Sequence, residues 1–195
     1  SSSTLFAADE NPFTQALSLE GNTENGKKVY RLCAACHLKN GWGKSNGSFP
    51  VLAGQHKSVI IKQLNNIQDK KRQNPTMSPF SDPETIGGKQ SIADVATYIA
   101  SMPSMTQHGQ GDGKAIKKGQ AIYQAKCTAC HGKKGEDNGV THIPKLSQQH
   151  YHYLLRQLKW IRDGLRQNSD PVMVTQIKKL SDDDLAAVAD YISRL

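Results

Sequence analysis

Cys33-Ala34-Ala35-Cys36-His37 and Cys127-Thr128-Ala129-Cys130-His131 are the two stretches that determine how this chain folds. They share one spacing, and together they contain all four cysteines of the 195 residues. On a helical turn, residues i, i+3 and i+4 lie on one face, so each stretch gathers two thiols and an imidazole. Two thioether bonds can hold one edge of a porphyrin there while the imidazole binds its iron. The pair predicts two covalently attached haems, with thioether bonds from Cys33, Cys36, Cys127 and Cys130 and iron ligands His37 and His131.

Three other interpretations of the cysteines were compared with haem attachment. A thioredoxin-like dithiol belongs in a βαβ unit, and the sequence has no strand pattern. A structural zinc site could use these cysteines and histidines, but it leaves the methionine pattern described below without a reason. Disulfides within each C-x-x-C are the third alternative. We favour haem because the motif occurs twice, at equivalent points of a repeat.

The whole chain repeats itself at an offset of 94 residues. The segment Pro50–His56 matches Pro144–His150, and Arg72–Asn74 matches Arg166–Asn168. Such self-similarity indicates duplicated domains. We expect an N-terminal extension (1–22), a first domain (23–106) and a second domain (107–195), joined through the turn-rich stretch 103–113.

Each half is expected to be all-α, with about three helices and long loops. The first helix is predicted over 23–35 and 113–129, and the second, with a one-sided apolar stripe, over 57–68 and 150–163. The third is predicted to begin at Ser91 and Ser181, where Asp94 and Asp184 would complete capping boxes. Only 36% of the residues are hydrophobic, and the mean hydropathy is −0.60. Such sparse cores around long loops favour a bulky ligand in each domain.

The formal net charge of +8 is spread over both halves. Lys and Arg number 11 against 8 Asp and Glu in residues 1–106, and 14 against 9 in residues 107–195. No basic stripe interleaved with aromatics is present, which argues against nucleic-acid binding. No apolar run reaches the roughly 18 residues of a membrane span. The stretch Ser1–Glu10 is compatible with the tail of a secretory signal.

The sixth iron ligand is predicted to be Met77 in the first half and Met173 in the second. Met173 is the only methionine after Cys127, and both residues follow an equivalent Arg-Gln-Asn triplet, which favours Met77 over Met102 and Met105. Both are expected in polar, Pro-containing loops, whereas a gap-filling methionine would lie on an apolar stripe. The alternative ligands are His56 and His150, which are expected instead at helix starts, partly exposed. His108, His142 and His152 are expected at the surface, and the core tyrosines are expected to be Tyr30, Tyr98, Tyr123 and Tyr191.

These features together resemble the class I c-type cytochromes, and specifically the dihaem cytochrome c4 family. The resemblance is carried by the two C-x-x-C-H motifs, the Pro-x-Leu-x-x-Gln segments, the methionine loops and the closing stretch Leu180–Ile192, and it covers residues 23–195. It implies two tandem class I cytochrome c domains that meet through an interface. It also implies that the carbonyls of Pro50 and Pro144 orient His37 and His131. The chain departs from the family pattern directly after the first motif. His37 is followed by Leu38, whereas His131 is followed by Gly132, as the family pattern has it.

The resemblance implies a periplasmic carrier that passes electrons from respiratory donors to a terminal oxidase, with no catalytic residue. Covalent haem is attached outside the bacterial cytoplasm, which also indicates the periplasm. We expect redox partners with an acidic docking surface, and association with an anionic membrane surface is compatible with the charge. The alternatives are the cytochrome subunit of a larger complex, such as a sulfide dehydrogenase, and a dihaem enzyme, such as a thiosulfate dehydrogenase or a peroxidase.

Overall fold

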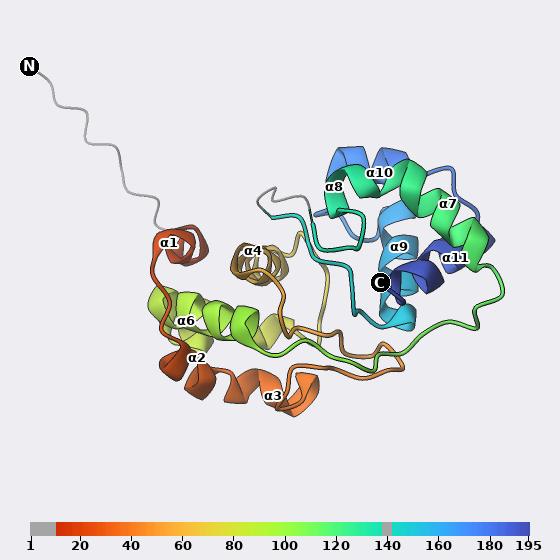
Figure 1. Ribbon diagram of the computed structural model, residues 1–195. Helices are drawn as coiled ribbons and strands as arrows, with labels where there is room; N and C mark the ends of the chain where they lie inside the picture. The colour runs from red at the N-terminus through yellow and green to blue at the C-terminus, as the bar shows by residue number, and fades with distance from the viewer. Residues whose placement is uncertain (1–10, 138–141) are drawn as a thin grey trace, which may run out of the picture.

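The structure is a computed structural model that describes residues 11–137 and 142–195. Within these ranges the regular elements are all helical, which agrees with the predicted fold class. Two groups of helices lie side by side and are joined by the chain between α6 and α7 (Figure 1). The first group is α1 (Pro12–Ser18), α2 (Thr23–Val29), α3 (Arg31–His37), α4 (Lys57–Gln68), the 3₁₀ helix η1 (Ser78–Phe80), α5 (Pro83–Ile86) and α6 (Gly88–Ser101). The second group is α7 (Ile116–Lys126), α8 (Thr128–His131), α9 (Tyr151–Arg162), α10 (Pro171–Ile177) and α11 (Asp182–Ile192).

Each half is built on one helix crossing, of α2 on α6 in the first half and of α7 on α11 in the second. The crossings are close because each has a glycine at the contact. A Cβ on Gly26 would lie 2.1 Å from the Asp94 carbonyl oxygen, and one on Gly119 would lie 2.0 Å from that of Ala187. No side chain fits at either position, so the two glycines set the distance between the helices.

The predicted core tyrosines flank these crossings in both halves. The rings of Tyr30 and Tyr98 are 5.5 Å apart, and so are those of Tyr123 and Tyr191. Tyr30 and Tyr123 are almost fully buried, and their hydroxyls donate to the carbonyls of Leu38 and Gly132. The tyrosines therefore attach the end of each cysteine motif to the helix crossing.

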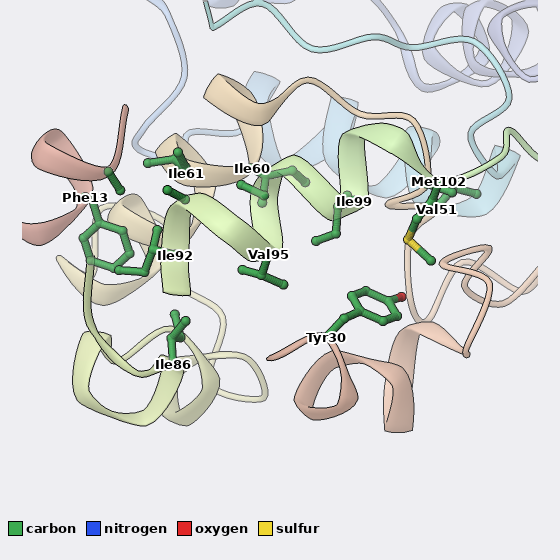
Figure 2. Close-up of a cluster of buried hydrophobic side chains, with 14 residues drawn as sticks. Phe13, Tyr30, Val51, Ile60, Ile61, Ile86, Ile92, Val95, Ile99 and Met102 are labelled. Atoms are coloured by element: carbon green, nitrogen blue, oxygen red, sulfur yellow. The ribbon is translucent and has the colours of Figure 1, made fainter. Parts of the chain in front are cut away.

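Helix α1 contributes to the first hydrophobic core although it lies in the extension outside the repeat. Phe13 and Ala16 are buried, and α1 packs against α4 and α6. Figure 2 shows Phe13 beside Ile92 and Ile61, at the opposite end of the cluster from Tyr30. The second half has its own cluster, which contains Leu158, Leu185 and Ile192. The domain limits 23–106 and 107–195 stay a prediction.

The predicted helices differ from the structure by more than one residue in three spans. The span 23–35 is interrupted at Tyr30, which separates α2 from α3, and the span 113–129 begins only at Ile116 and is interrupted at Cys127. Helix α6 starts at Gly88 instead of Ser91, because the short helix α5 ends at Gly87, whose positive φ of 104° turns the chain directly into α6. The predicted capping box at Ser181 and Asp184 is present.

Asp94 has a role other than the predicted cap. It is buried inside α6 and accepts hydrogen bonds from the Asn22 backbone N–H (2.8 Å) and the Asn25 side-chain amide (2.6 Å). It therefore attaches the start of α2 to α6. Within the described ranges, no helix combines the length and the apolar run that a bilayer crossing requires.

Candidate functional site

The two cysteine motifs form the ends of α3 and α8, and both helices stop at the histidine. His37 and His131 are followed by residues with positive φ, Leu38 at 66° and Gly132 at 76°. This turn sends the chain away from the helix and toward the proline segments Pro50–Gln55 and Pro144–Gln149. In the first half, both thiols and the imidazole lie on α3, whereas in the second half Cys127 is the N-cap of α8, which carries Cys130 and His131.

Both histidines are buried and held in one orientation. His37 is 4% exposed and His131 is 7% exposed. The Nδ1 of each ring lies 3.1 Å from a proline carbonyl oxygen, Pro50 for His37 and Pro144 for His131. A carbonyl can only accept, so Nδ1 carries the proton and Nε2 keeps its lone pair for a metal. The expected orienting role of the two proline carbonyls is confirmed.

Burial also keeps these rings neutral. It lowers the pKa of His37 and of His131, and this effect outweighs the opposing influence of the proline carbonyls and, for His131, of Asp137. An iron ligand must offer a lone pair, so a lowered pKa favours the form that binds metal.

The four thiols form no disulfide. Burial raises the pKa of Cys33 and of Cys127 to about 11; it is opposed at Cys127 by the charge of Lys126, and the second cysteine of each motif acts in the same direction as burial. These thiols are therefore protonated at neutral pH, unlike the thiolate of a dithiol oxidoreductase. Among the described residues, no group of three or more Cys, His, Asp or Glu side chains is arranged to hold a metal ion.

The methionines separate into packing residues and candidate ligands. Met102 is 6% exposed and lies in the first hydrophobic core beside Val51 (Figure 2), which fits a packing role. Met77 lies outside that cluster, half-buried in the turn that leads into η1. Met173 was expected in a loop, but it lies on α10, because Asp170 caps a helix that starts at Pro171. It packs, half-buried, against the second core. The ligand roles of Met77 and Met173 stay predictions.

His150 is not the partly exposed residue that was expected. It is fully buried, and both of its ring nitrogens are used. Nε2 donates to the Trp42 carbonyl of the first half (2.7 Å), and Nδ1 accepts from the Gly109 backbone N–H (3.0 Å). It therefore has no free nitrogen for iron. His56, whose side chain is 40% exposed, contacts the Asp137 carboxylate through Nε2.

The three histidines without a repeat partner differ in exposure. His152 is exposed, as expected, whereas His108 and His142 are half-buried.

A cluster that the sequence did not predict lies between α4 and α9. Arg72 donates to Gln63 Oε1 (2.8 Å) and to the Tyr153 hydroxyl (2.8 Å). Arg166 donates to Gln157 Oε1 (2.9 Å) and to Gln63 Oε1 (3.1 Å). Burial, followed by the charge of Arg72, lowers the pKa of Arg166 to about 10. The only signal in the sequence was that Arg72 and Arg166, like Gln63 and Gln157, are equivalent in the repeat.

This arginine cluster provides a test of whether haem fits the protein. Among the described residues, neither guanidinium has an ion pair with a carboxylate. Two half-buried cations without counter-ions are costly, and they are compensated when anions bind beside them. A haem brings two propionate carboxylates, so the donor set suits that group.

Comparisons with known proteins match this arrangement. The cytochrome c family model matches residues 23–103 and 116–195. The chain is 31% identical over 185 residues to cytochrome c4 of Pseudomonas aeruginosa, covering 90% of this chain and 89% of that protein. It is 29% identical over 198 residues to a thiosulfate dehydrogenase electron acceptor of Stutzerimonas stutzeri, covering 92% and 90%. The crystal structure of reduced recombinant cytochrome c4 from Pseudomonas stutzeri is similar with a TM-score of 0.77 at 30% identity, covering 88% of this chain and 97% of that one.

Proposed function

This chain belongs to the cytochrome c family, as a dihaem electron carrier of the cytochrome c4 type with two covalently bound haem c groups, and we propose that it transfers electrons in the periplasm from respiratory donors to a terminal oxidase. The observation that supports a carrier most directly is the state of the two histidines. Both are buried and neutral, and both are oriented by a proline carbonyl with Nε2 left for iron.

The cysteines of each motif would attach one haem, and the iron ligands would be His37 with Met77 and His131 with Met173. Arg72 and Arg166 would face the propionates. When bound, the haem iron supplies one-electron chemistry by alternating between its ferric and ferrous states. A thioether ligand raises the reduction potential, which suits the oxidase end of a respiratory chain. Two protein ligands for each iron leave no open position for a substrate, so we assign no catalytic residue.

The surface charge points to acidic partners. The chain carries a formal net charge of +8, which the haem propionates make less positive. A cationic carrier is steered toward an acidic docking surface, and salt weakens that attraction. Because one relative is named as the electron acceptor of thiosulfate dehydrogenase, we propose a periplasmic oxidising enzyme of that class as one electron donor. The rate of reduction by such a donor should fall as the ionic strength rises.

The ligands can be tested by replacing each methionine separately. Met77→Ala and Met173→Ala should each remove about half of the methionine-to-iron charge-transfer absorption of the ferric protein, and the double variant should lack it. Met105→Leu is the matched control, since Met105 only packs against the first core, and it should keep the whole band. A wild-type ferric protein without this band, or a reduced protein that readily binds carbon monoxide, would refute the proposed carrier function.

Haem attachment has a separate test. In acid acetone, the haem colour should stay with the polypeptide, because thioether bonds survive denaturation. Colour that moves into the solvent would contradict covalent attachment through the four cysteines.

A further inference from the structure

Two glutamines connect the halves of the molecule by the same contact, made once in each direction. The Gln149 side chain accepts from the Val51 backbone N–H (2.9 Å) and donates to the Val51 carbonyl (3.0 Å). The Gln55 side chain accepts from the Lys145 backbone N–H (3.0 Å) and donates to the Lys145 carbonyl (2.9 Å). Since Gln55 and Gln149, like Val51 and Lys145, are equivalent in the repeat, the two links form a reciprocal pair.

Each link ends on the peptide group that holds a haem-ligand histidine in the other half. In the first half, the carbonyl of the Pro50–Val51 peptide accepts from His37 Nδ1, and the N–H of the same peptide donates to Gln149. The Pro144–Lys145 peptide has the same arrangement in the second half, between His131 and Gln55. One planar amide therefore lies between each histidine and a side chain of the opposite half.

An amide in this position transmits polarisation. A partner that accepts from the N–H increases the negative charge on the carbonyl oxygen, so hydrogen bonds in a chain strengthen one another. A stronger acceptor at Nδ1 makes the imidazole a better electron donor at Nε2, which stabilises the ferric iron. The effect is large where water is excluded, and His37, Val51 and Gln149 are all less than a tenth exposed.

We propose that Gln149 and Gln55 are positioning residues that tune the haem of the opposite half: Gln149 lowers the potential of the haem at His37, and Gln55 lowers that of the haem at His131. The inference rests on the proposed function for its iron ligands. Gln55 and Lys145 are only half-buried, so the link at Gln55 has the smaller effect. Contact between the halves thereby sets both potentials.

The test is a redox titration of Gln149→Leu and Gln55→Leu holoprotein, combined with NMR of the reduced protein labelled with ¹⁵N-histidine. Gln149→Leu should change the ferric-to-ferrous equilibrium of the haem at His37 about threefold in favour of the ferrous form, or ~28 mV at 59 mV per tenfold change. The Nδ1 proton of His37 should move upfield, and that of His131 should stay in place. Gln55→Leu should produce the converse result with a smaller shift.

Arg156→Lys is the matched control. Arg156 donates to the Gly47 carbonyl across the same interface (2.7 Å), and it touches neither proline peptide. This variant should loosen the interface and leave both Nδ1 protons unmoved. If Gln149→Leu shifts both haems equally, shifts neither, or acts like Arg156→Lys, the inference is wrong. Should Gln149→Leu fail to fold, Gln55→Leu alone decides it through the His131 proton. If the glutamine variants keep the methionine-to-iron charge-transfer band and their potentials are unchanged, the inference is wrong and the proposed function is not affected.

Discussion

Leu38, directly after the proposed haem ligand His37, has a backbone conformation that favours glycine. Its φ of 66° and ψ of 160° are nearly those of its repeat partner Gly132, at 76° and 167°. Residues with a Cβ rarely occupy this region. We therefore expect glycine to be more stable than alanine at position 38, which reverses the usual order of these two residues.

The size of the reversal follows from two opposing effects. Strain in this region costs about 1–3 kcal/mol, and glycine relieves it. Glycine also makes the unfolded chain more flexible, which lowers the stability of the folded state by about 0.4–1 kcal/mol relative to alanine. With strain near the middle of its range, the free energy of unfolding of Leu38→Gly should be about 1 kcal/mol larger than that of Leu38→Ala. For a domain of this size, that difference raises the melting temperature by ~4–8 °C. Comparing alanine with glycine cancels the packing lost with the leucine side chain.

Leu165 is the matched control because it is an exposed leucine whose φ is not positive. There, Leu165→Gly should melt below Leu165→Ala. The measurement is the loss of far-ultraviolet circular dichroism of the oxidised holoprotein on heating. If glycine is the less stable residue at both positions, Leu38 is not strained and the reasoning is refuted.

Three other predictions concern stability. Gly26→Ala and Gly119→Ala should each cost about 1–3 kcal/mol, because the new Cβ meets a backbone carbonyl that cannot move aside; urea unfolding measures this, and a neutral result would disprove the close crossing. Ser181→Ala should cost about 1 kcal/mol through loss of the α11 cap, whereas Ser91→Ala, inside α6, should be nearly neutral; equal costs would contradict the assigned helix starts. Burial, opposed by the Trp42 carbonyl and reinforced by His108, lowers the pKa of His150. The unfolded state then binds the proton first, so His150 makes stability fall as the pH drops below its ordinary value of about 6.5. His150→Gln should reduce the fall of the melting temperature below that pH, and an unchanged dependence of the melting temperature on pH would contradict this role of His150.

Local sequence patterns predicted the elements whose limits are set by nearby residues. The apolar stripes located α4 and α9 to within a residue, and the helical turn expected at each cysteine motif is present. The methionines proposed as iron ligands could not be placed as well. Met173 lies on a helix because of the cap at Asp170, a signal that was outweighed by the polar composition around it.

Contacts between the halves were beyond sequence reasoning. Gln149, His150 and Arg166 obtain their partners from residues about a hundred positions away, and no periodicity encodes such pairs. His150 was expected to be partly exposed because a polar residue at a helix start usually is. It is buried because two backbone groups from elsewhere in the chain satisfy both nitrogens.

Comparing the sequences of the two halves would have predicted the backbone conformation at more positions than either half alone. Positive φ recurs at equivalent positions in both, with glycine in only one of them: Leu38 and Gly132, Lys70 and Gly164, Gln148 and Gly54. A glycine in one copy thus reports the conformation of a larger residue in the other.

The reciprocal glutamine links give the molecule the geometry of an isologous dimer joined into one polypeptide. In a true homodimer, each substitution at the contact would appear on both sides at once. Here each side can change by itself, and the position held by Val51 in one half is already held by Lys145 in the other. Fusion therefore lets a symmetric assembly acquire two halves that differ in sequence at equivalent positions of the contact.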